Sequence, residues 1–285
     1  MNIESLLGEI PKTKFVQEYF HRLPFSLAGA ARSVCQLGSW EVLGEILGQD
    51  GVDVMVVRDG QQYAGTDPRT LEHAKTLSAE GYTILVRHAE SHHEQLKKLA
   101  AGFEDDFHAP ANIHSYATPA GKHGFSWHYD AEEVFIVQTT GRKEYSLRKN
   151  TVHPWPLVET IPQDMGYRRE ITPLMRVLLS AGDWLYIPCG YWHKAEAQES
   201  NETAISLALG VMSPSAMDVY DHLRPRLLGS LLWRQRLAAG GAASTLSSDE
   251  LVSHYRELFE QLADDLAKTL RDEQFLHDFL ARRES

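Results

Sequence analysis

The sequence predicts a mainly β protein with helices, of the α+β class, built from three successive regions. Short β-branched and aromatic runs alternate with turn residues from about Ala111 to Met212, which predicts an antiparallel barrel or sandwich. Before this region the chain mixes strand-like and helix-like patterns, and after it apolar residues recur at helical spacing. We therefore expect an α/β N-terminal region over residues 1–110, a β core over 111–212 and a helical C-terminal region over 213–285.

The composition is typical of an ordinary globular protein. Of the 285 residues, 43% are hydrophobic and 24% are charged, which is sufficient for a sizeable core. No apolar run reaches the length of a membrane span, and the acidic N-terminus does not resemble a signal peptide. Cys35 and Cys189 lie far apart and form no CxxC pair, which favours a reducing, cytoplasmic location.

The formal net charge of −11 narrows the classes of partner. An acidic surface repels nucleic-acid phosphates unless a basic patch compensates, so direct DNA binding is not expected. Such a surface attracts basic proteins more readily. The alternative is that the charge only aids solubility.

In the N-terminal region, residues 52–57 (VDVMVV) and 82–86 (YTILV) have the length and β-branched content of strands. Between them, residues 68–79 favour a helix with Pro68 in its first turn. A further helix is expected to begin at Ser91, because Ser91 and Glu94 have the spacing of a capping box. We interpret these elements as scaffold.

Several short runs predict the strands of the core, at residues 133–138, 142–147, 176–180, 184–188 and 204–211. The stretch 150–173 contains Pro154, Pro156, Pro162 and Pro173 and is expected to be a long irregular loop. Loops of this length often carry function.

In the C-terminal region, residues 217–237 predict a helix broken or offset at Pro225, and residues 240–244 (GGAAS) predict a linker. Residues 248–282 predict a second helical region, with apolar residues every three or four positions: Leu251, Tyr255, Leu258, Leu262, Leu266 and Leu270. This stripe either packs on the protein's own barrel or forms an interface between subunits. Further apolar residues favour a homodimer, namely Leu227, Leu228, Leu231, Leu232 and Trp233.

The segment HGFSWHYDAEEVF contains two candidate metal ligands. Side chains alternate along an extended chain, so His128 and Asp130 are expected on the same side. An imidazole and a carboxylate on one face make two thirds of a facial triad for non-haem iron, although an isolated H-x-D is common by chance. His123, close to Gly121 and Gly124, is interpreted as a loop residue.

The segment 182–193 (GDWLYIPCGYWH) supplies the third candidate ligand. A tight turn leads into a buried strand, and a bend after that strand aims His193 inward. The two segments together favour a metal site held by His128, Asp130 and His193 over two unrelated core histidines. Such a triad leaves three octahedral positions for a bidentate 2-oxo acid and O₂, which favours iron(II) over a closed structural zinc; manganese and nickel fit the same ligands.

These segments, with the strand YATP (116–119), closely resemble the JmjC/cupin-type iron(II)- and 2-oxoglutarate-dependent oxygenases, particularly the ribosomal-oxygenase and asparaginyl-hydroxylase branch. The spacing G-x5-P-x-G-x2-H is the second motif of the cupin superfamily. The resemblance covers about residues 80–212. It implies a double-stranded β-helix, or jelly roll, with the metal inside one open end, and oxidative decarboxylation of 2-oxoglutarate by O₂.

The resemblance also implies residues that bind the co-substrate. Lys143 matches the cation that pairs with the distal carboxylate of 2-oxoglutarate, since a buried carboxylate needs a charged partner. The alternative is a solvated hairpin lysine, and Arg142 is expected on the opposite face. Tyr116 and Ser206 match positions that line the co-substrate pocket, or else they are core residues with satisfied hydroxyls.

Two departures from the family pattern leave the substrate open. Relatives in the ribosomal branch often have asparagine two residues before the tyrosine, where this sequence has His114. Larger members carry a C-terminal winged-helix domain, for which residues 213–285 look too short.

The resemblance implies hydroxylation of a protein side chain, and the acidic charge favours a basic, extended, ribosomal-type substrate. One alternative is hydroxylation of a small molecule, such as a free amino acid, a peptide natural product or a modified tRNA base. Another is a non-catalytic metal-binding cupin, against which the complete triad and Lys143 argue. Demethylation of methyl-lysine uses the same chemistry and stays open.

Overall fold

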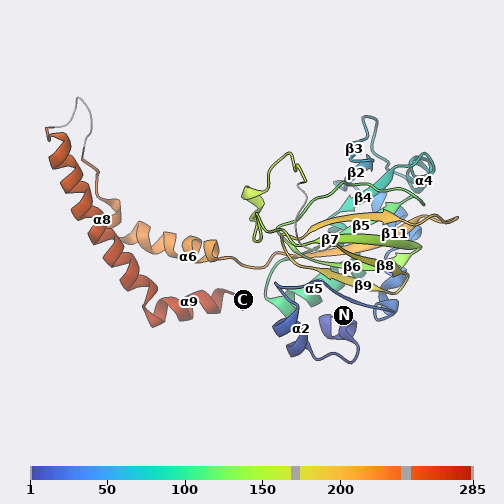
Figure 1. The fold of residues 1–285 in the computed structure, drawn as a ribbon, viewed down its shortest axis with the longest axis horizontal. Helices are drawn as coiled ribbons and strands as arrows, with labels where there is room; N and C mark the ends of the chain where they lie inside the picture. The colour runs from blue at the N-terminus through green and yellow to red at the C-terminus, as the bar shows by residue number, and fades with distance from the viewer. Residues whose placement is uncertain (1, 168–173, 239–244, 284–285) are drawn as a thin grey trace. The chain divides into compact units, whose positions relative to one another are not determined.

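The structure, a computed structural model, describes residues 2–167, 174–238 and 245–283. The chain divides into two compact units, Met1–Ser213 and Pro214–Ser285 (Figure 1). Within the described ranges, no helix is long and apolar enough to cross a bilayer.

The first unit begins with helices and short strands. Up to residue 110 these are α1 (Ile3–Leu7), α2 (Lys12–Glu18), β1 (Phe25–Leu27), η1 (Arg32–Leu37), α3 (Trp40–Leu47), β2 (Asp53–Arg58), β3 (Gln61–Gln62), α4 (Leu71–Ala79), β4 (Thr83–Arg87), η2 (Ala89–Ser91) and α5 (Glu94–Phe107). Beyond residue 110 they are β5 (Ala111–Thr118), β6 (Glu133–Thr140), β7 (Arg142–Arg148), η3 (Val158–Thr160), β8 (Met175–Ser180), β9 (Trp184–Ile187), β10 (Trp192–Ala197) and β11 (Ala204–Val211).

The described strands form two antiparallel sheets. The large sheet has eight strands in the order β1-β9-β6-β11-β5-β4-β2-β3, and the small sheet has three in the order β10-β7-β8. Buried side chains from both sheets share one core, including Ile136 of β6, Tyr145 and Leu147 of β7, and Leu179 of β8. Two sheets packed face to face in this way confirm the predicted jelly-roll class.

Strand β6 lies inside the large sheet and is covered on both faces. Val134 and Ile136 face the small sheet, while Phe135 and Val137 belong to a second core on the opposite face. A strand buried on both faces reads as a continuous apolar run, which explains why residues 133–138 show no polar alternation.

The N-terminal region supplies strands as well as helices to this architecture. Strand β1 pairs with β9, and β4 pairs with β5, so both extend the large sheet. The outer face of that sheet packs on residues from α1, α2 and α5, and Phe15 is fully buried there. Trp184 of β9 donates its indole N–H to the carbonyl oxygen of Leu6 at 2.7 Å.

Two helix starts differ from the predictions. Helix α5 begins at Glu94, and its N-cap is His93; Ser91 instead ends the 3₁₀ turn η2. The predicted capping box of Ser91 and Glu94 does not form, because the left-handed conformation of His88 (φ 52°) starts this separate turn. Helix α4 begins at Leu71, where the hydroxyl of Thr70 accepts the amide N–H of His73 at 3.2 Å.

The loop after β7 is irregular over residues 149–167 except for η3, and residues 168–173 of the predicted loop lie outside the described residues. Strand β10 was not among the predicted strands. It follows the bend at Gly190 directly, and its sequence WHKAEA lacks β-branched residues.

The second unit is helical within its described residues, with α6 (Ala216–Gly229), α7 (Leu231–Arg234), α8 (Ser248–Leu270) and α9 (Glu273–Arg283). The predicted break at Pro225 is wrong, because Pro225 lies inside α6 and the helix ends at Gly229. Glycine is a poor helix former, so the end falls there. The predicted helical region 248–282 is two helices, and the predicted linker 240–244 lies outside the described residues.

Candidate active site

The three predicted metal ligands lie together at the end of the jelly roll. His128, Asp130 and His193 offer side-chain atoms within 4.8 Å of one another. Nε2 of His193 is 3.4 Å from Oδ2 of Asp130. The two ligand segments are joined by an isolated antiparallel bridge between His128 and His193.

The orientation of both imidazoles suits a metal. Nδ1 of His128 lies 2.9 Å from the carbonyl oxygen of Ser126, and Nδ1 of His193 lies 3.0 Å from that of Tyr191. A carbonyl only accepts a hydrogen bond, so each Nδ1 carries the proton. Both Nε2 atoms therefore have a free lone pair, which is the arrangement found in metal-binding histidines. Two such nitrogens and one carboxylate fit a facial triad for iron(II).

Burial also keeps His193 in the form that binds a metal. The buried environment, with His128 beside it, lowers the pKa of His193 to about 4. At neutral pH its imidazole is therefore uncharged, as a ligand must be.

The backbone around the triad explains how each ligand is aimed. Residues 127–130 form no regular strand, yet their side chains alternate: Tyr129 is buried and packs edge-on against Trp192 at 4.7 Å, on the side away from the ligands. Gly190 (φ 77°) makes the bend, and its N–H donates to the carbonyl oxygen of Asp130 at 2.9 Å. A Cβ at Gly190 would lie 2.6 Å from the carbonyl oxygen of Pro154, so this bend requires glycine.

A cavity opens beside the triad and brings together all of the predicted site residues. It is lined by His128, Asp130 and His193, and also by Lys143, Tyr116 and Ser206. The register of β11 against β5 places Ser206 directly opposite Tyr116.

Lys143 is buried, with 3% of its surface exposed, whereas Arg142 is exposed on the other side of β7. Nζ of Lys143 donates to Oγ of Ser206 at 3.1 Å and lies 5.5 Å from the centre of the Tyr116 ring. No carboxylate in the described part of the chain pairs with it, and burial lowers its pKa to about 7. The alternative of a solvated hairpin lysine is therefore wrong. A buried amine without an internal carboxylate can pair with an external one, which favours its charged form.

Hydroxyl groups surround Lys143. Burial raises the pKa of both Tyr116 and Tyr145 well above the ordinary value, so both remain protonated donors. Tyr145 also hydrogen-bonds Ser206. Together these groups offer a carboxylate several donors next to one positive charge.

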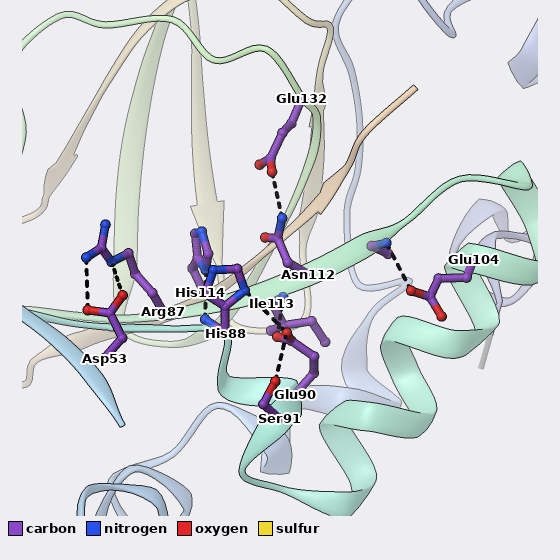
Figure 2. A network of polar contacts seen from close by, with 11 residues as sticks. Asp53, Arg87, His88, Glu90, Ser91, Glu104, Asn112, Ile113, His114 and Glu132 are labelled. Atoms are coloured by element: carbon purple, nitrogen blue, oxygen red, sulfur yellow. Dashed lines mark hydrogen bonds and ion pairs between the residues drawn. The ribbon is translucent and has the colours of Figure 1, made fainter. Parts of the chain in front are cut away.

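The cavity is also lined by residues that were not predicted as site residues, namely Phe125, Glu132 and Tyr145. His114 lines it too, although the sequence analysis named it only as a departure from the family pattern. Figure 2 shows Glu132 next to Asn112, whose amide donates to Oε1 of Glu132 at 2.6 Å. Burial raises the pKa of Glu132, and the Asn112 amide offsets part of this rise. The alternation of β5, with residues 112, 114 and 116 on one face, was the signal that would have identified His114 and Asn112.

An aromatic cluster flanks the triad. Trp127 stacks on Tyr167 with ring centres 4.7 Å apart, and Tyr167 packs edge-on against Trp192 at 5.3 Å. Tyr167 thus connects the loop after β7 to the two ligand segments.

Comparison with known proteins agrees with this geometry. Residues 85–219 match the JmjC domain. The chain is 28% identical over 228 residues to the bifunctional lysine-specific demethylase and histidyl-hydroxylase NO66 of Drosophila sechellia, covering 76% of this chain and 35% of that protein. It is 28% identical over 229 residues to ribosomal oxygenase 2 of Rattus norvegicus, covering 76% and 48% respectively. The chain therefore spans about a third of the NO66 protein and about half of ribosomal oxygenase 2.

Solved structures share the fold. The ribosomal oxygenase YcfD of Escherichia coli has a TM-score of 0.61 and 19% identity, covering 93% of this chain and 68% of that chain. A structure of YcfD in complex with cobalt and 2-oxoglutarate has a TM-score of 0.59 and 18% identity, covering 97% and 71%. The match to the JmjC domain over residues 85–219 thus contains the His-Asp-His cluster, and the solved structures share the fold.

Proposed function

We propose that this protein is an iron(II)- and 2-oxoglutarate-dependent oxygenase that hydroxylates a side chain of a basic, ribosomal-type protein. One observation carries the proposal: Lys143, which is buried and has no carboxylate partner among the described residues, lines the same cavity as two histidines whose Nε2 atoms are free. A diacid with a 2-oxo group matches both features, because one carboxylate pairs with the cation and the 2-oxo acid end reaches the metal.

The strand register gives a suitable spacing for this diacid. Lys143 lies opposite Ala197 at the end of β10, and His193 lies four residues earlier on that strand. The distance along the strand from Ala197 to His193 is therefore about 13 Å, at roughly 3.3 Å per residue. The long lysine side chain spans part of it, and a five-carbon diacid spans the rest.

In this proposal His128, Asp130 and His193 hold iron(II), and Lys143, Tyr116 and Ser206 hold the distal carboxylate of 2-oxoglutarate. Bound iron(II) supplies O₂ activation and the oxidative decarboxylation of 2-oxoglutarate to succinate and CO₂. The protein's own groups position the co-substrate: Lys143 neutralises its charge, and the two hydroxyl groups donate hydrogen bonds. The buried strands exclude water from that end of the cavity.

The substrate class rests on charge and on the relatives. The net charge of −11 favours a basic partner, and complementary charge chiefly increases the association rate. The named relatives are a bifunctional lysine-specific demethylase and histidyl-hydroxylase and two ribosomal oxygenases, which supports a protein substrate over a small molecule.

We also propose a cytoplasmic homodimer that does not contact DNA directly. In this arrangement residues 111–212 are the catalytic core, with residues 1–110 packed on it, and residues 213–285 form the dimer interface. Support comes from α8, where Val252 and Phe259 are 57% and 60% exposed beside an apolar groove. Both cysteines are free thiols, which fits a reducing compartment.

The function is tested by incubating the iron-loaded protein with 2-oxoglutarate and either basic ribosomal proteins or free amino acids. We expect a gain of one oxygen atom on a protein side chain, coupled to succinate formation, and none with Asp130→Ala. Hydroxylation of a free amino acid with no protein modified would favour the small-molecule alternative. Loss of a methyl group from a methylated lysine would identify demethylation.

A further inference from the structure

The segment that leads to the first metal ligand has little regular structure of its own. After β5 ends, residues 119–127 form turns and bends. Strand β10 holds this segment at two points, where Gly121 and Lys122 hydrogen-bond the backbone of Ala197 and where His128 pairs with His193. The contacts of the backbone between these two points therefore decide how His128 is aimed.

The β2–β3 hairpin holds the segment from another side. Asp59 and Gly60 form its two-residue tip, and both have left-handed conformations (φ 52° and 76°), as in a type I′ turn. The N–H of Gly60 donates to the carbonyl oxygen of Gly124 at 2.8 Å, and that of Asp59 donates to the carbonyl oxygen of His123 at 3.4 Å. Oδ1 of Asp59 also lies 3.6 Å from Nε2 of His123. The tip thus contacts the segment through its main chain and through a side chain.

The contact continues from the hairpin tip to the imidazole of His128. A Cβ built on Gly60 would lie 3.0 Å from Oγ of Ser126, so the two chains approach closely at this point. The carbonyl oxygen of Ser126 accepts the hydrogen bond from Nδ1 of His128 at 2.9 Å, which leaves Nε2 free for a metal. Phe125 lines the cavity, with its ring centre 5.9 Å from that of His128. A shift of this short segment would therefore move a ligand and the cavity wall together.

We propose that the tip of the β2–β3 hairpin, Asp59 and Gly60, is a positioning element for the metal ligand His128. The inference rests on the proposed function and adds two residues that do not line the cavity. Glycine at position 60 permits both the left-handed conformation and the close approach to Ser126. The hydrogen bonds to residues 123 and 124 fix the path of the segment, and the Ser126 carbonyl then holds the imidazole in one tautomer and one orientation.

The test measures Mn(II) affinity in a double-mutant cycle. Gly60→Ala places a Cβ against Ser126 and should weaken Mn(II) binding about tenfold, because a group that orients a metal ligand is displaced. Ser126→Ala removes Oγ but keeps the carbonyl. Gly60→Ala made in the Ser126→Ala background should therefore change the Mn(II) affinity by less than about twofold. Titration calorimetry under nitrogen, with 2-oxoglutarate present, gives the Kd of each protein.

Gly51→Ala is the matched control. Gly51 precedes β2 and has nearly the same conformation (φ 75°), but a Cβ there meets nothing within 4 Å. Gly51→Ala and Gly60→Ala should both lower the urea midpoint of the metal-free protein, because both strain the backbone. Only Gly60→Ala should weaken Mn(II) binding, which separates positioning from a general loss of stability.

A second readout follows His128 in the metal-free protein. Nitrogen NMR of isotope-labelled histidine rings distinguishes the Nδ1–H tautomer from the Nε2–H tautomer. His128 should carry its proton on Nδ1 in the wild type and in Gly51→Ala, and Gly60→Ala should reduce this population. Asp59→Asn keeps a residue that tolerates the left-handed conformation and removes the charge beside His123. It should weaken Mn(II) binding by a smaller factor than Gly60→Ala.

The outcomes separate this inference from the proposed function. If the wild type binds Mn(II) and 2-oxoglutarate but Gly60→Ala binds Mn(II) as tightly as Gly51→Ala, the inference is overturned and the oxygenase proposal stands. The same holds if Gly60→Ala loses as much affinity in the Ser126→Ala background. If Gly60→Ala does not fold, Asp59→Asn decides, and an unchanged Mn(II) affinity in that variant overturns the inference. If the wild type binds neither Mn(II) nor 2-oxoglutarate, the proposed function fails and this inference falls with it.

Discussion

His128 and His193 donate backbone hydrogen bonds to each other, with N–O distances of 3.1 and 2.7 Å. Two metal ligands from distant segments are thus aligned by their main chains, independently of their side chains. A second backbone contact, from Gly190 to Asp130, places the third ligand in the same way. The ligand geometry is therefore preorganised by the fold.

This relationship predicts that loss of a ligand removes metal without unfolding the protein. His128→Ala, Asp130→Ala and His193→Ala should each abolish iron(II) binding and 2-oxoglutarate turnover. The melting temperature of the metal-free protein should change little, because the backbone bridge remains. Metal analysis after anaerobic loading and thermal unfolding measure the two effects. Full turnover in all three variants would show that the triad is not the metal site.

Lys143→Ala should weaken 2-oxoglutarate binding by about 2–3 kcal/mol, or roughly 30- to 150-fold, because a buried carboxylate loses its charged partner. Lys143→Arg should retain part of the affinity, since the charge remains. Titration calorimetry with the Mn(II)-loaded protein measures both variants. Arg142→Ala is the control, because its exposed side chain lies on the other side of the strand. An unchanged affinity in Lys143→Ala would place the anchor elsewhere.

The buried ammonium also predicts a pH dependence of the metal-free protein. The folded-state pKa of Lys143 is about 7, below the ordinary value of 10.5, so the unfolded chain binds more protons between these pH values. The contribution of Lys143 to the free energy of unfolding should therefore rise by up to about 1.4 kcal/mol per pH unit from about pH 7. Lys143→Met removes this contribution. Urea unfolding of both proteins from pH 6 to 9 gives the difference, and a constant difference would contradict the prediction.

The exposed groove of α8 predicts how the dimer is disrupted. Val252→Asp or Phe259→Asp places a charge on its apolar surface and should convert a dimer into monomers. Ser253→Asp adds the same charge outside the groove and should leave the dimer intact. Sedimentation velocity at micromolar concentration distinguishes the states. A wild-type protein that sediments as a monomer would remove the dimer proposal.

The acidic charge predicts salt-sensitive encounter with the substrate. The association rate for a basic protein should fall several-fold between low and physiological ionic strength, because screening shortens the range of attraction. The dissociation rate should change much less. Stopped-flow binding at several salt concentrations measures both rates, and a salt-independent association rate would argue that the charge serves solubility alone.

The sequence alone was sufficient where the determinants are local. Spacing within each segment identified His128, Asp130 and His193 as candidate ligands, because extended alternation and a glycine bend are encoded by neighbouring residues. The core strands 133–138, 142–147, 176–180 and 204–211 were predicted for the same reason. A buried strand retains its apolar content whichever strands pair with it.

Only the tertiary structure decided the features that depend on distant neighbours. The start of α5 and the continuation of α6 through Pro225 are exceptions, because they were decided by the local backbone conformation and not by distant neighbours. The pairing of β4 with β5 put N-terminal residues into the large sheet, and the register of β5, β11 and β6 joined Asn112, Gly210 and Glu132. Burial of Lys143 was likewise decided by the large sheet opposite β7, where Ser206 and Tyr116 lie next to its Nζ. Such contacts join residues far apart in the chain. Their free energies depend on burial and on whether polar groups are paired, and a local sequence pattern records neither.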